Sequence, residues 1–506
     1  MRRMTSPGGS RRFWAPVALI AGYALLVACW LGANPPGAAA DEPEHYVRAL
    51  SVGMGVWIGS PARTVRAFPE DPERAPFMYV ISRDVPVPRG LGAPASWSCF
   101  INDHVSSGAC LVRDTASADS RQTTYQGSYP PVYYILPGVA MRSAREPLAA
   151  LLVGRAVTAI IGLGFLAIAV LALWDQAAGA ISLAGVSLAI SPMVLSVAGS
   201  LSTSGAEIPA GVATVAIILR LGRQDRVSAW MKWALVAALA VLAAVRPFGP
   251  AYVLFALVLG ALHLGPGALR EAISRSLAAR VGLAVVVLAT LATVAWDQVF
   301  LVQRLPSPAA VPGLLGLGLL YVSEAAREMI GVFGQTDTLM PGWAYGLWGL
   351  TSVGLIAFAL QVGTHRQRRV LEATLLGVVL VGVVLALVEL PTGFGVNGRQ
   401  VLPVAVAIPM LAGETCYLRR SRLSAGRYRA LSITVLVTIP VVQLAGWYAN
   451  AHRVAVGTAG PWWFVARPQW APPGGWLSWQ LLALVGTSCL VASLVARNGR
   501  PGGPAR

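Results

Sequence analysis

Charged residues are scarce in this sequence: Asp, Glu, Lys and Arg make up 12% of the 506 residues, about half of the ~25% typical of soluble domains. Cysteine is also rare, with five residues and no C-x-x-C pair, so the common structural zinc sites are excluded. The Walker A, G-x-G-x-x-G and G-x-S-x-G motifs are missing. Their absence argues against P-loop nucleotide hydrolysis, dinucleotide binding and nucleophile-elbow catalysis.

Apolar residues are abundant instead. They supply 56% of the chain and fall into blocks of about 17–25 residues, the length of helix that crosses ~30 Å of hydrocarbon. Backbone polar groups must be satisfied inside lipid, so such blocks form helices. The sequence predicts an all-α polytopic membrane protein with about 12 transmembrane helices (range about 11–13) and a large extracytoplasmic first loop. The expected spans are Phe13–Ala33, Leu148–Trp174, Ala178–Val197, Ala206–Leu221, Ser228–Val245, Pro250–Leu264, Leu277–Trp296, Pro341–Val362, Val370–Leu390, Val401–Ala412, Ala430–Trp447 and Leu477–Ala496.

One apolar block differs from the others. Val311–Ile330 carries Glu324, Arg327 and Glu328, and three charges within one helix are costly in hydrocarbon. We therefore expect a helix that lies in the outer interface of the membrane rather than a span.

The arginines set the expected orientation. With both ends inside, the cytoplasmic segments and adjoining span ends hold 22 of the 39 basic residues and the short outer loops hold six, which is the positive-inside asymmetry. The chain then divides into a cytoplasmic tail with the first helix (1–33), an extracytoplasmic loop (34–147), a helical bundle (148–496) and a cytoplasmic tail (497–506). This predicts a multi-pass plasma-membrane protein whose N- and C-termini are both cytoplasmic.

The N-terminus permits a second interpretation. Ser10–Trp14 reads S-R-R-F-W, and Ala38–Ala40 precedes Asp41, a pattern that resembles an export signal with a cleavage site. The apolar run between them is longer than a usual signal core, which favours an uncleaved first helix.

The net charge of +17 follows from this topology. A nucleic-acid-binding protein gathers its basic residues on one folded face, whereas here they are spread over the inner loops. We expect membrane lipids as partners and no nucleic acid.

The first loop contains no long helical pattern, but it contains two cysteines, Cys99 and Cys110. Both would face an oxidising compartment, which predicts a disulfide between them.

Polar residues at the outer ends of the spans are the candidate site. The densest group follows the first span and contains Asp41, Glu42, Glu44 and His45. Three carboxylates and an imidazole can supply a general base or hold a cation, which leaves a divalent cation as the only cofactor candidate. A solvated acidic cap on the first span is the alternative.

Other polar groups recur at the same expected level of the membrane. An arginine on a short outer turn opposes the topology rule and is explained if its planar fork meets a phosphate or a carboxylate; Arg155, near the outer end of its span, is a further candidate. The remaining expected substrate-binding residues lie in short motifs that follow or begin spans. Together these candidates are Tyr133, Arg155, Glu207, Arg246, Asp337, Arg399 and Gln400.

The motifs taken in order resemble one bacterial family. D-E-x-x-H at Asp41, P-P-x-Y-Y at Pro130, S-x-x-x-S-G-x-E at Ser200, F-G-x-x-D at Phe333 and G-R-x-x-L-P at Gly398 are similar to the predicted membrane proteins of domain of unknown function 2142. The resemblance covers about residues 41–413. Ser202-Thr203 and Asn397-Gly398-Arg399-Gln400 depart from the Asn-Pro and Q-G-R-Y typical of the family.

That family is similar to the C-type glycosyltransferases, which use lipid-phosphate-linked sugars. The resemblance implies transfer of a sugar from a polyprenyl-phosphate donor to a cell-envelope glycan or lipid acceptor, with inversion, at the outer face of a bacterial plasma membrane. An acid of the first outer loop acts there as base or metal ligand. Carried onto this chain, it is Asp41, with Glu42 beside it, while Arg399 stabilises the departing phosphate.

Two other classes stay open. Twelve spans with both ends inside also fit a transporter or flippase of lipid-linked sugars, although the polar residues are expected at the outer surface rather than at the midplane, where transporter sites lie. The departures from the family motifs also fit a non-catalytic component of envelope polysaccharide assembly.

Overall fold

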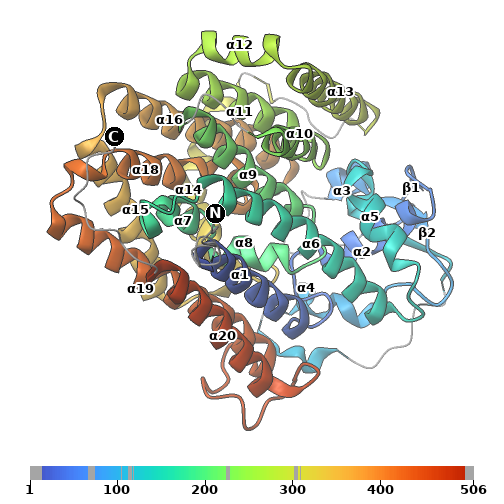
Figure 1. The fold of residues 1–506 in the computed structure, drawn as a ribbon. Helices are drawn as coiled ribbons and strands as arrows, with labels where there is room; N and C mark the ends of the chain where they lie inside the picture. Colours follow the sequence, from blue (N-terminus) through green and yellow to red (C-terminus); the bar gives the residue numbers. More distant parts are fainter. Residues whose placement is uncertain are drawn as a thin grey trace, which may run out of the picture.

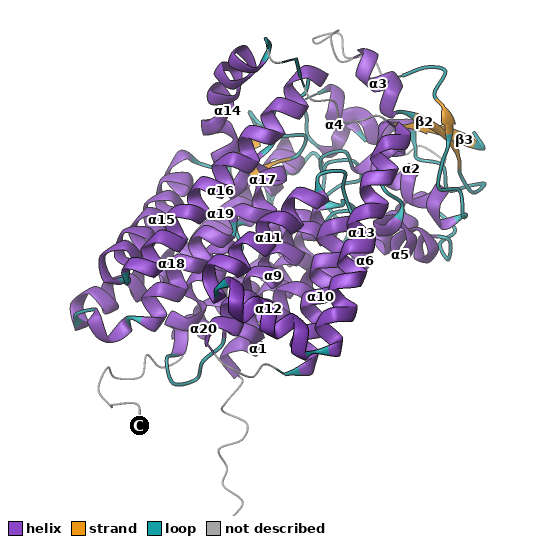
Figure 2. Ribbon diagram, turned by 90° about the horizontal axis from the view of Figure 1, so that it is seen from above, coloured by secondary structure: helices purple, strands orange, loops and turns teal. Residues whose placement is uncertain are grey.

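The computed structural model describes residues 14–65, 75–103, 105–111, 117, 119–223, 228–300, 306–307 and 309–495. The S-R-R segment of the possible export signal and both predicted cytoplasmic tails lie outside these residues, apart from Trp14 at the start of the first helix. Helices dominate the described chain (Figures 1 and 2).

Nine stretches of helix in the described residues are long and apolar enough to cross a membrane. They are α1 (Trp14–Ala33), α6 (Pro147–Leu173), α9 (Ser204–Arg223), α13 (Leu277–Phe300), α15 (Gly342–Val362), α16 (His365–Glu389), α17 with α18 (Gly398–Ala405 and Ala407–Leu418), α19 (Ala425–Val456) and α20 (Gly475–Val495).

Three further predicted spans are short or broken. Helices α10 (Ala229–Ala244) and α11 (Gly249–Leu264) have 16 residues each, or ~24 Å at 1.5 Å per residue. The segment predicted as Ala178–Val197 is a helix pair bent by 68°. It consists of η5 and α7 (Gly179–Leu183 and Ala184–Ala189), then α8 (Pro192–Ala198). Each predicted span thus coincides with helical structure, and the all-α membrane fold is confirmed.

The expectation of one continuous helix over Ala178–Val197 was wrong, and a proline explains the break. Pro192 has no N–H to donate, and the residue before a proline is pushed out of the α region. Ser191 accordingly adopts extended backbone, with ψ 168°. The same lack of a donor, at Pro409, accompanies the division between α17 and α18.

Helices α1 and α20 pack side by side although they lie at opposite ends of the sequence (Figure 1). Gly22 allows the close approach: a Cβ atom there would lie 2.8 Å from the carbonyl oxygen of Gly486. Small residues serve this purpose at helix contacts in membranes.

The first loop folds at one end of the bundle, which we call the loop end (Figure 2). Its elements are α2 (Glu42–Gly53), β1 (Ser60–Pro61), α3 (Ala75–Ile81), β2 (Arg83–Pro86), α4 (Cys99–Asn102), β3 (Arg121–Thr124) and α5 (Val132–Met141). The strands form an antiparallel sheet in the order β1-β2-β3, in which Arg83 faces Thr124. A disulfide joins Cys99 to Cys110.

Helix α2 was not predicted from the sequence. Eleven of its twelve residues are buried, because it packs tightly against α5. A Cβ atom on Gly138 would lie 2.1 Å from the carbonyl oxygen of Ala49, so only glycine allows this crossing. The crossing fixes α2, and with it the residue that precedes it, to the bundle.

The charged block forms helix α14 (Val311–Gly331), which packs against α16 and α17. It is not among the helices apolar enough to span, and its position in the membrane interface stays a prediction. It leads into a hairpin of β4 (Val332–Phe333) and β5 (Thr338–Leu339).

Candidate functional site

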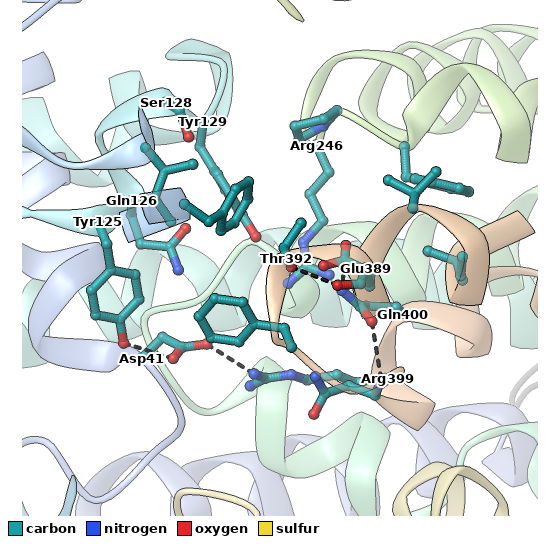
Figure 3. A pocket seen from close by; sticks show the side chains of 18 of the residues that line it. Asp41, Tyr125, Gln126, Ser128, Tyr129, Arg246, Glu389, Thr392, Arg399 and Gln400 are labelled. Carbon is teal, nitrogen blue, oxygen red and sulfur yellow. Dashed lines mark hydrogen bonds and ion pairs between the residues drawn. The ribbon is translucent and has the colours of Figure 1, made fainter. Parts of the chain in front are cut away.

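A cavity with about 980 Å³ of open space lies at the loop end and is called here the first cavity. Segments far apart in the sequence meet around it: the start of α2, the turn η4 (Tyr125–Ser128), the α10–α11 turn, the end of α16 and the start of α17 (Figure 3). Four residues that the sequence singled out line it together: Asp41, Arg246, Arg399 and Gln400.

Asp41 is the N-cap of α2 and has left-handed backbone, with φ 58°. Its Oδ2 accepts a hydrogen bond from Nη2 of Arg399 at 2.8 Å, and its Oδ1 accepts one from the Tyr125 hydroxyl at 2.8 Å (Figure 3). Burial alone would raise the pKa of the Asp41 carboxyl. Arg399, followed by His45, Tyr125 and Arg246, outweighs burial and holds this pKa below its ordinary value. Asp41 is therefore a carboxylate at neutral pH.

Arg246 is buried in the turn between α10 and α11. Its Nε donates to the Thr203 hydroxyl and its Nη2 to the Ser204 hydroxyl, both at 2.9 Å. The Nε also lies 3.6 Å from the Glu207 carboxylate. Thr203, Ser204 and Glu207 thus hold this guanidinium, and the cavity receives a pre-oriented positive charge.

Arg399 and Gln400 occupy the first turn of α17. The Asn397 side chain and the Gln400 side chain close a capping box there, which satisfies two of the free N–H groups of a helix start. Gln400 Nε2 also donates to Oε1 of Glu389 at 3.2 Å. The capping box and the Glu389 contact hold the α17 turn in place, and with it Arg399 beside Asp41.

Part of the wall of the first cavity is apolar. Six of its side chains are Phe77, Ile81, Phe248, Leu385, Val388 and Phe394. A cavity with two guanidinium groups and an apolar wall suits an amphiphile that combines an anionic head with a hydrocarbon part. A carboxylate that accepts protons stands at its edge.

The expected divalent cation does not fit these residues. No group of three or more His, Cys, Asp or Glu side chains gathers anywhere in the described part of the chain. Both oxygens of Asp41 already accept hydrogen bonds, one of them from a cation. The positive charge beside Asp41 is the guanidinium of Arg399.

Glu42, expected beside Asp41 as a catalytic residue, points the other way. It is 0% exposed, forms a two-point ion pair with Arg155, and accepts hydrogen bonds from the backbone N–H groups of Leu201 and Gly37. Glu42 does not line the first cavity. Every contact of Glu42 lies inside the protein, which indicates a structural role; the catalytic role expected from the sequence stays a prediction.

The contacts of Arg155, expected as a phosphate ligand, also lie inside the protein. Besides Glu42, its guanidinium donates to the backbone carbonyls of Leu31, Asn34 and Pro35. No N–H is left for a ligand.

Three expected substrate contacts lie behind the cavity wall. His45 is buried, and its Nδ1 lies 2.7 Å from the Tyr134 hydroxyl; burial lowers the pKa of His45 to about 3, so the ring is neutral. Tyr133 pairs with the Thr158 hydroxyl at 2.8 Å, and Oε2 of Glu44 accepts from the Tyr125 backbone N–H at 3.1 Å. These residues shape the site without lining it.

Glu207 and Asp337 also lie outside the first cavity. Glu207 is fully buried behind Arg246, and Asp337 lies 3.7 Å from Arg453. Neither lines the cavity in the positions described.

Several lining residues were not predicted. Tyr125, Gln126, Ser128 and Tyr129 form one wall, immediately before the P-P-x-Y-Y motif, which drew attention to Tyr133 instead. Glu389 also lines the cavity, although the sequence indicated it only as a carboxylate partner for an outer arginine. An acid at the edge of an apolar span is costly unless it faces a cavity or a partner.

Comparison with known proteins identifies the family. A family model described as "Predicted membrane protein (DUF2142)" matches residues 24–408, which confirms the family predicted from the motifs. No curated protein matches the sequence.

Two solved structures of ArnT from Cupriavidus metallidurans show a distant likeness. The one bound to undecaprenyl phosphate is 13% identical with a TM-score of 0.41, over 98% of this chain and 78% of that chain. The apo structure is 15% identical with a TM-score of 0.38, over 89% and 76%. At these scores the likeness assigns no role to any residue here.

Proposed function

Because this chain belongs to the DUF2142 family of predicted membrane proteins, and because its cavity pairs a carboxylate with arginines and an apolar wall, we propose that it is a membrane glycosyltransferase of the C type. It takes a sugar from a polyprenyl-phosphate donor and gives it to a cell-envelope glycan or lipid on the outer face of a bacterial plasma membrane. The observation that carries the proposal is the position of Asp41 beside Arg399 in the lining of the first cavity.

The lining assigns a place to each part of the donor. The phosphate lies against Arg246 and Arg399, and the polyprenyl chain follows the apolar wall towards the hydrocarbon of the membrane. A planar guanidinium binds phosphate by two parallel hydrogen bonds. Two such groups, one of them fixed by Thr203 and Ser204, stabilise the charge that develops on the departing phosphate.

Asp41 supplies the base. A sugar hydroxyl is a weak nucleophile, so a carboxylate takes its proton as its oxygen attacks the anomeric carbon. The new bond is oxygen to anomeric carbon; the bond that breaks joins this carbon to the phosphate oxygen, which leaves with the electron pair. One direct displacement of this kind inverts the anomeric centre. The positive charges in this reaction are those of Arg246 and Arg399.

The placement on the outer face rests on the distribution of basic residues. The first loop and the first cavity share the loop end of the bundle. The segments expected inside, with the adjoining span ends, hold 22 of the 39 basic residues, against six in the short outer loops. An outer location gives access to lipid-linked sugars and to envelope acceptors, and it suits the Cys99–Cys110 disulfide.

The test has two parts. Lipid-linked sugars that accumulate when the gene is deleted identify the donor by mass spectrometry. Purified protein is then given that lipid together with an envelope extract, and transfer of the sugar is measured. Release of polyprenyl phosphate with a new glycoside is the expected result. Movement of the intact lipid-linked sugar between leaflets, without cleavage, would show a flippase instead.

A further inference from the structure

A second cavity adjoins the first. Arg399 lines both cavities, so its side chain forms part of the boundary between them. Residues from the α1–α2 turn, α8, the α8–α9 loop, α14 and the β4–β5 hairpin complete the lining. The polar ones besides Arg399 are Asn34, Ser196, Ser200, Ser202, Glu328 and Thr336.

The two linings differ in chemistry. The first cavity combines two arginines with an apolar wall, which suits a lipid phosphate. The second has a single cation, shared with the first, and a group of hydroxyls and amide or carboxyl oxygens. Such a surface offers both donors and acceptors to a neutral ligand that carries several hydroxyl groups.

The serine hydroxyls keep capacity for a ligand. Ser200 Oγ donates to the Val197 carbonyl oxygen at 3.1 Å, and Ser202 Oγ accepts from the Ser204 backbone N–H at 3.3 Å. A hydroxyl can make one further contact or more beyond these. Both serines are 3% exposed. A buried hydroxyl group is stabilised when its remaining hydrogen-bonding positions find a partner, which a hydroxylated ligand can supply.

Two segments at the boundary between the cavities have left-handed backbone. Asp41 and Thr336 are the two non-glycine residues with positive φ in the described chain, at 58° and 67°. Gln335 connects their segments: its Nε2 donates to the carbonyls of Gly37 and Ala39, and its Oε1 lies 3.4 Å from the Asp41 backbone N. Strained backbone of this kind persists where the surroundings enforce it, and it gathers at functional sites.

We propose that the second cavity binds the hydroxyl-bearing glycan acceptor, an inference that rests on the proposed function. A donor phosphate in the first cavity leaves the anomeric carbon open to attack from the other side. An acceptor sugar in the second cavity presents its hydroxyl at the boundary, next to Asp41. The substrate class is a neutral sugar, or the sugar end of a glycolipid, recognised by Ser196, Ser200, Ser202 and Thr336.

The experiment measures two ligands on one protein. Wild-type protein in nanodiscs is mixed with three probe glycosides, methyl β-D-glucopyranoside, methyl α-D-mannopyranoside and methyl α-L-rhamnopyranoside, and binding is followed by saturation-transfer NMR. We expect at least one glycoside to bind, and to stay bound when undecaprenyl phosphate is added to saturation. Undecaprenyl phosphate binding is measured separately, as a shift in melting temperature.

Two variants localise the glycoside. Replacing Ser200→Ala together with Ser202→Ala should weaken glycoside binding on the order of 10-fold, since two hydrogen bonds are lost, and should leave undecaprenyl phosphate binding unchanged, which also reports correct folding. Ser187→Ala is the matched control, because Ser187 is a buried serine of α7 that lines neither cavity.

Each other outcome overturns a stated part. If no probe glycoside binds, if undecaprenyl phosphate displaces it, or if the double variant binds it normally, the second cavity is not the acceptor site. Displacement by undecaprenyl phosphate glucose, but not by undecaprenyl phosphate, would assign the cavity to the donor's own sugar. If a glycoside binds but undecaprenyl phosphate does not, the proposed donor fails and the sugar site stands.

Discussion

Glu42 and Arg155 meet in a two-point ion pair, with both side chains about 1% exposed. Glu42 is the first residue of α2 and Arg155 lies in the third turn of α6, so the pair ties the first loop to the bundle. Asp41 precedes Glu42 and faces the opposite way, into the first cavity. The two adjacent acids therefore divide the work: one holds the turn and the other is available for chemistry.

The first prediction tests the structural role of Glu42. A buried pair that loses one partner leaves an unpaired charge, which typically costs about 3–5 kcal/mol. We expect Glu42→Gln to lower the melting temperature of the detergent-solubilised protein strongly, and Glu42→Gln with Arg155→Gln to recover part of the loss. A Glu42→Gln variant with normal melting but no sugar transfer would support the catalytic interpretation of Glu42.

The second prediction concerns Asp41. Asparagine keeps the size and one acceptor of aspartate but takes up no proton, so Asp41→Asn should reduce the rate of sugar transfer roughly 10²–10⁴-fold. Undecaprenyl phosphate should still bind, as measured by the shift in melting temperature. Asp119→Asn, at an exposed acid of the same loop, is the matched control and should transfer normally. Near-full activity of Asp41→Asn would remove Asp41 as the base.

A third prediction follows from the charges around Asp41. The base works as a carboxylate, so activity falls only when the pH drops through its pKa, which lies below the ordinary value of 3.8. With the pKa of His45 near 3, neither group titrates between pH 5 and 8. For wild type we expect no change of kcat/KM in that range from these groups.

Removing the cation moves this limb. In Arg399→Gln the effect of burial is less opposed, so the pKa of Asp41 rises and the acid limb of the kcat/KM profile moves to higher pH. Arg399→Lys keeps the charge and should keep the limb near its wild-type position, while the loss of the planar fork weakens donor binding. Identical pH profiles for wild type and Arg399→Gln would show that Arg399 does not set the pKa of the catalytic base.

The fourth prediction tests the orientation. A cysteine in place of Arg121, exposed on β3, should react with a membrane-impermeant maleimide in intact cells. A cysteine in place of Arg366, exposed in the first turn of α16, should react only after permeabilisation. Cys489 is a partly exposed free cysteine, so both variants are made in a Cys489→Ser background. Cys29 and Cys416 are buried and can stay. The reverse pattern of labelling would put the first cavity on the cytoplasmic side.

The helices could be predicted because membrane spans depend on composition and length, which are local properties of a sequence. The break in the third span was also visible, since Pro192 lies in its interior; a window of average hydropathy does not register it. Helix α2 was not predicted, because it depends on contacts that are distant in the sequence. Its sequence is polar at the start and its burial comes from α5, about ninety residues later.

The site could be predicted only in part. Asp41, Arg246, Arg399 and Gln400 each stand at the end of an apolar block, so a single rule placed them on one side of the membrane. Which acid of the D-E-P-E run faces the cavity depends on the left-handed backbone of Asp41. It also depends on a partner of Glu42 that lies 113 residues away. No local pattern encodes either.

The shared position of Arg399 has a kinetic consequence. In the free protein its guanidinium is hydrogen-bonded to the carboxylate of Asp41, which makes that carboxylate a weak base. A donor phosphate that draws the guanidinium towards itself strengthens the base at the moment when the reactive sugar arrives. Under the proposed function, an acceptor can bind at any time, but its hydroxyl is deprotonated efficiently only after the donor has bound. The leaving lipid phosphate, as long as it occupies Arg399, then acts as a product inhibitor that competes with fresh donor and slows the next turnover.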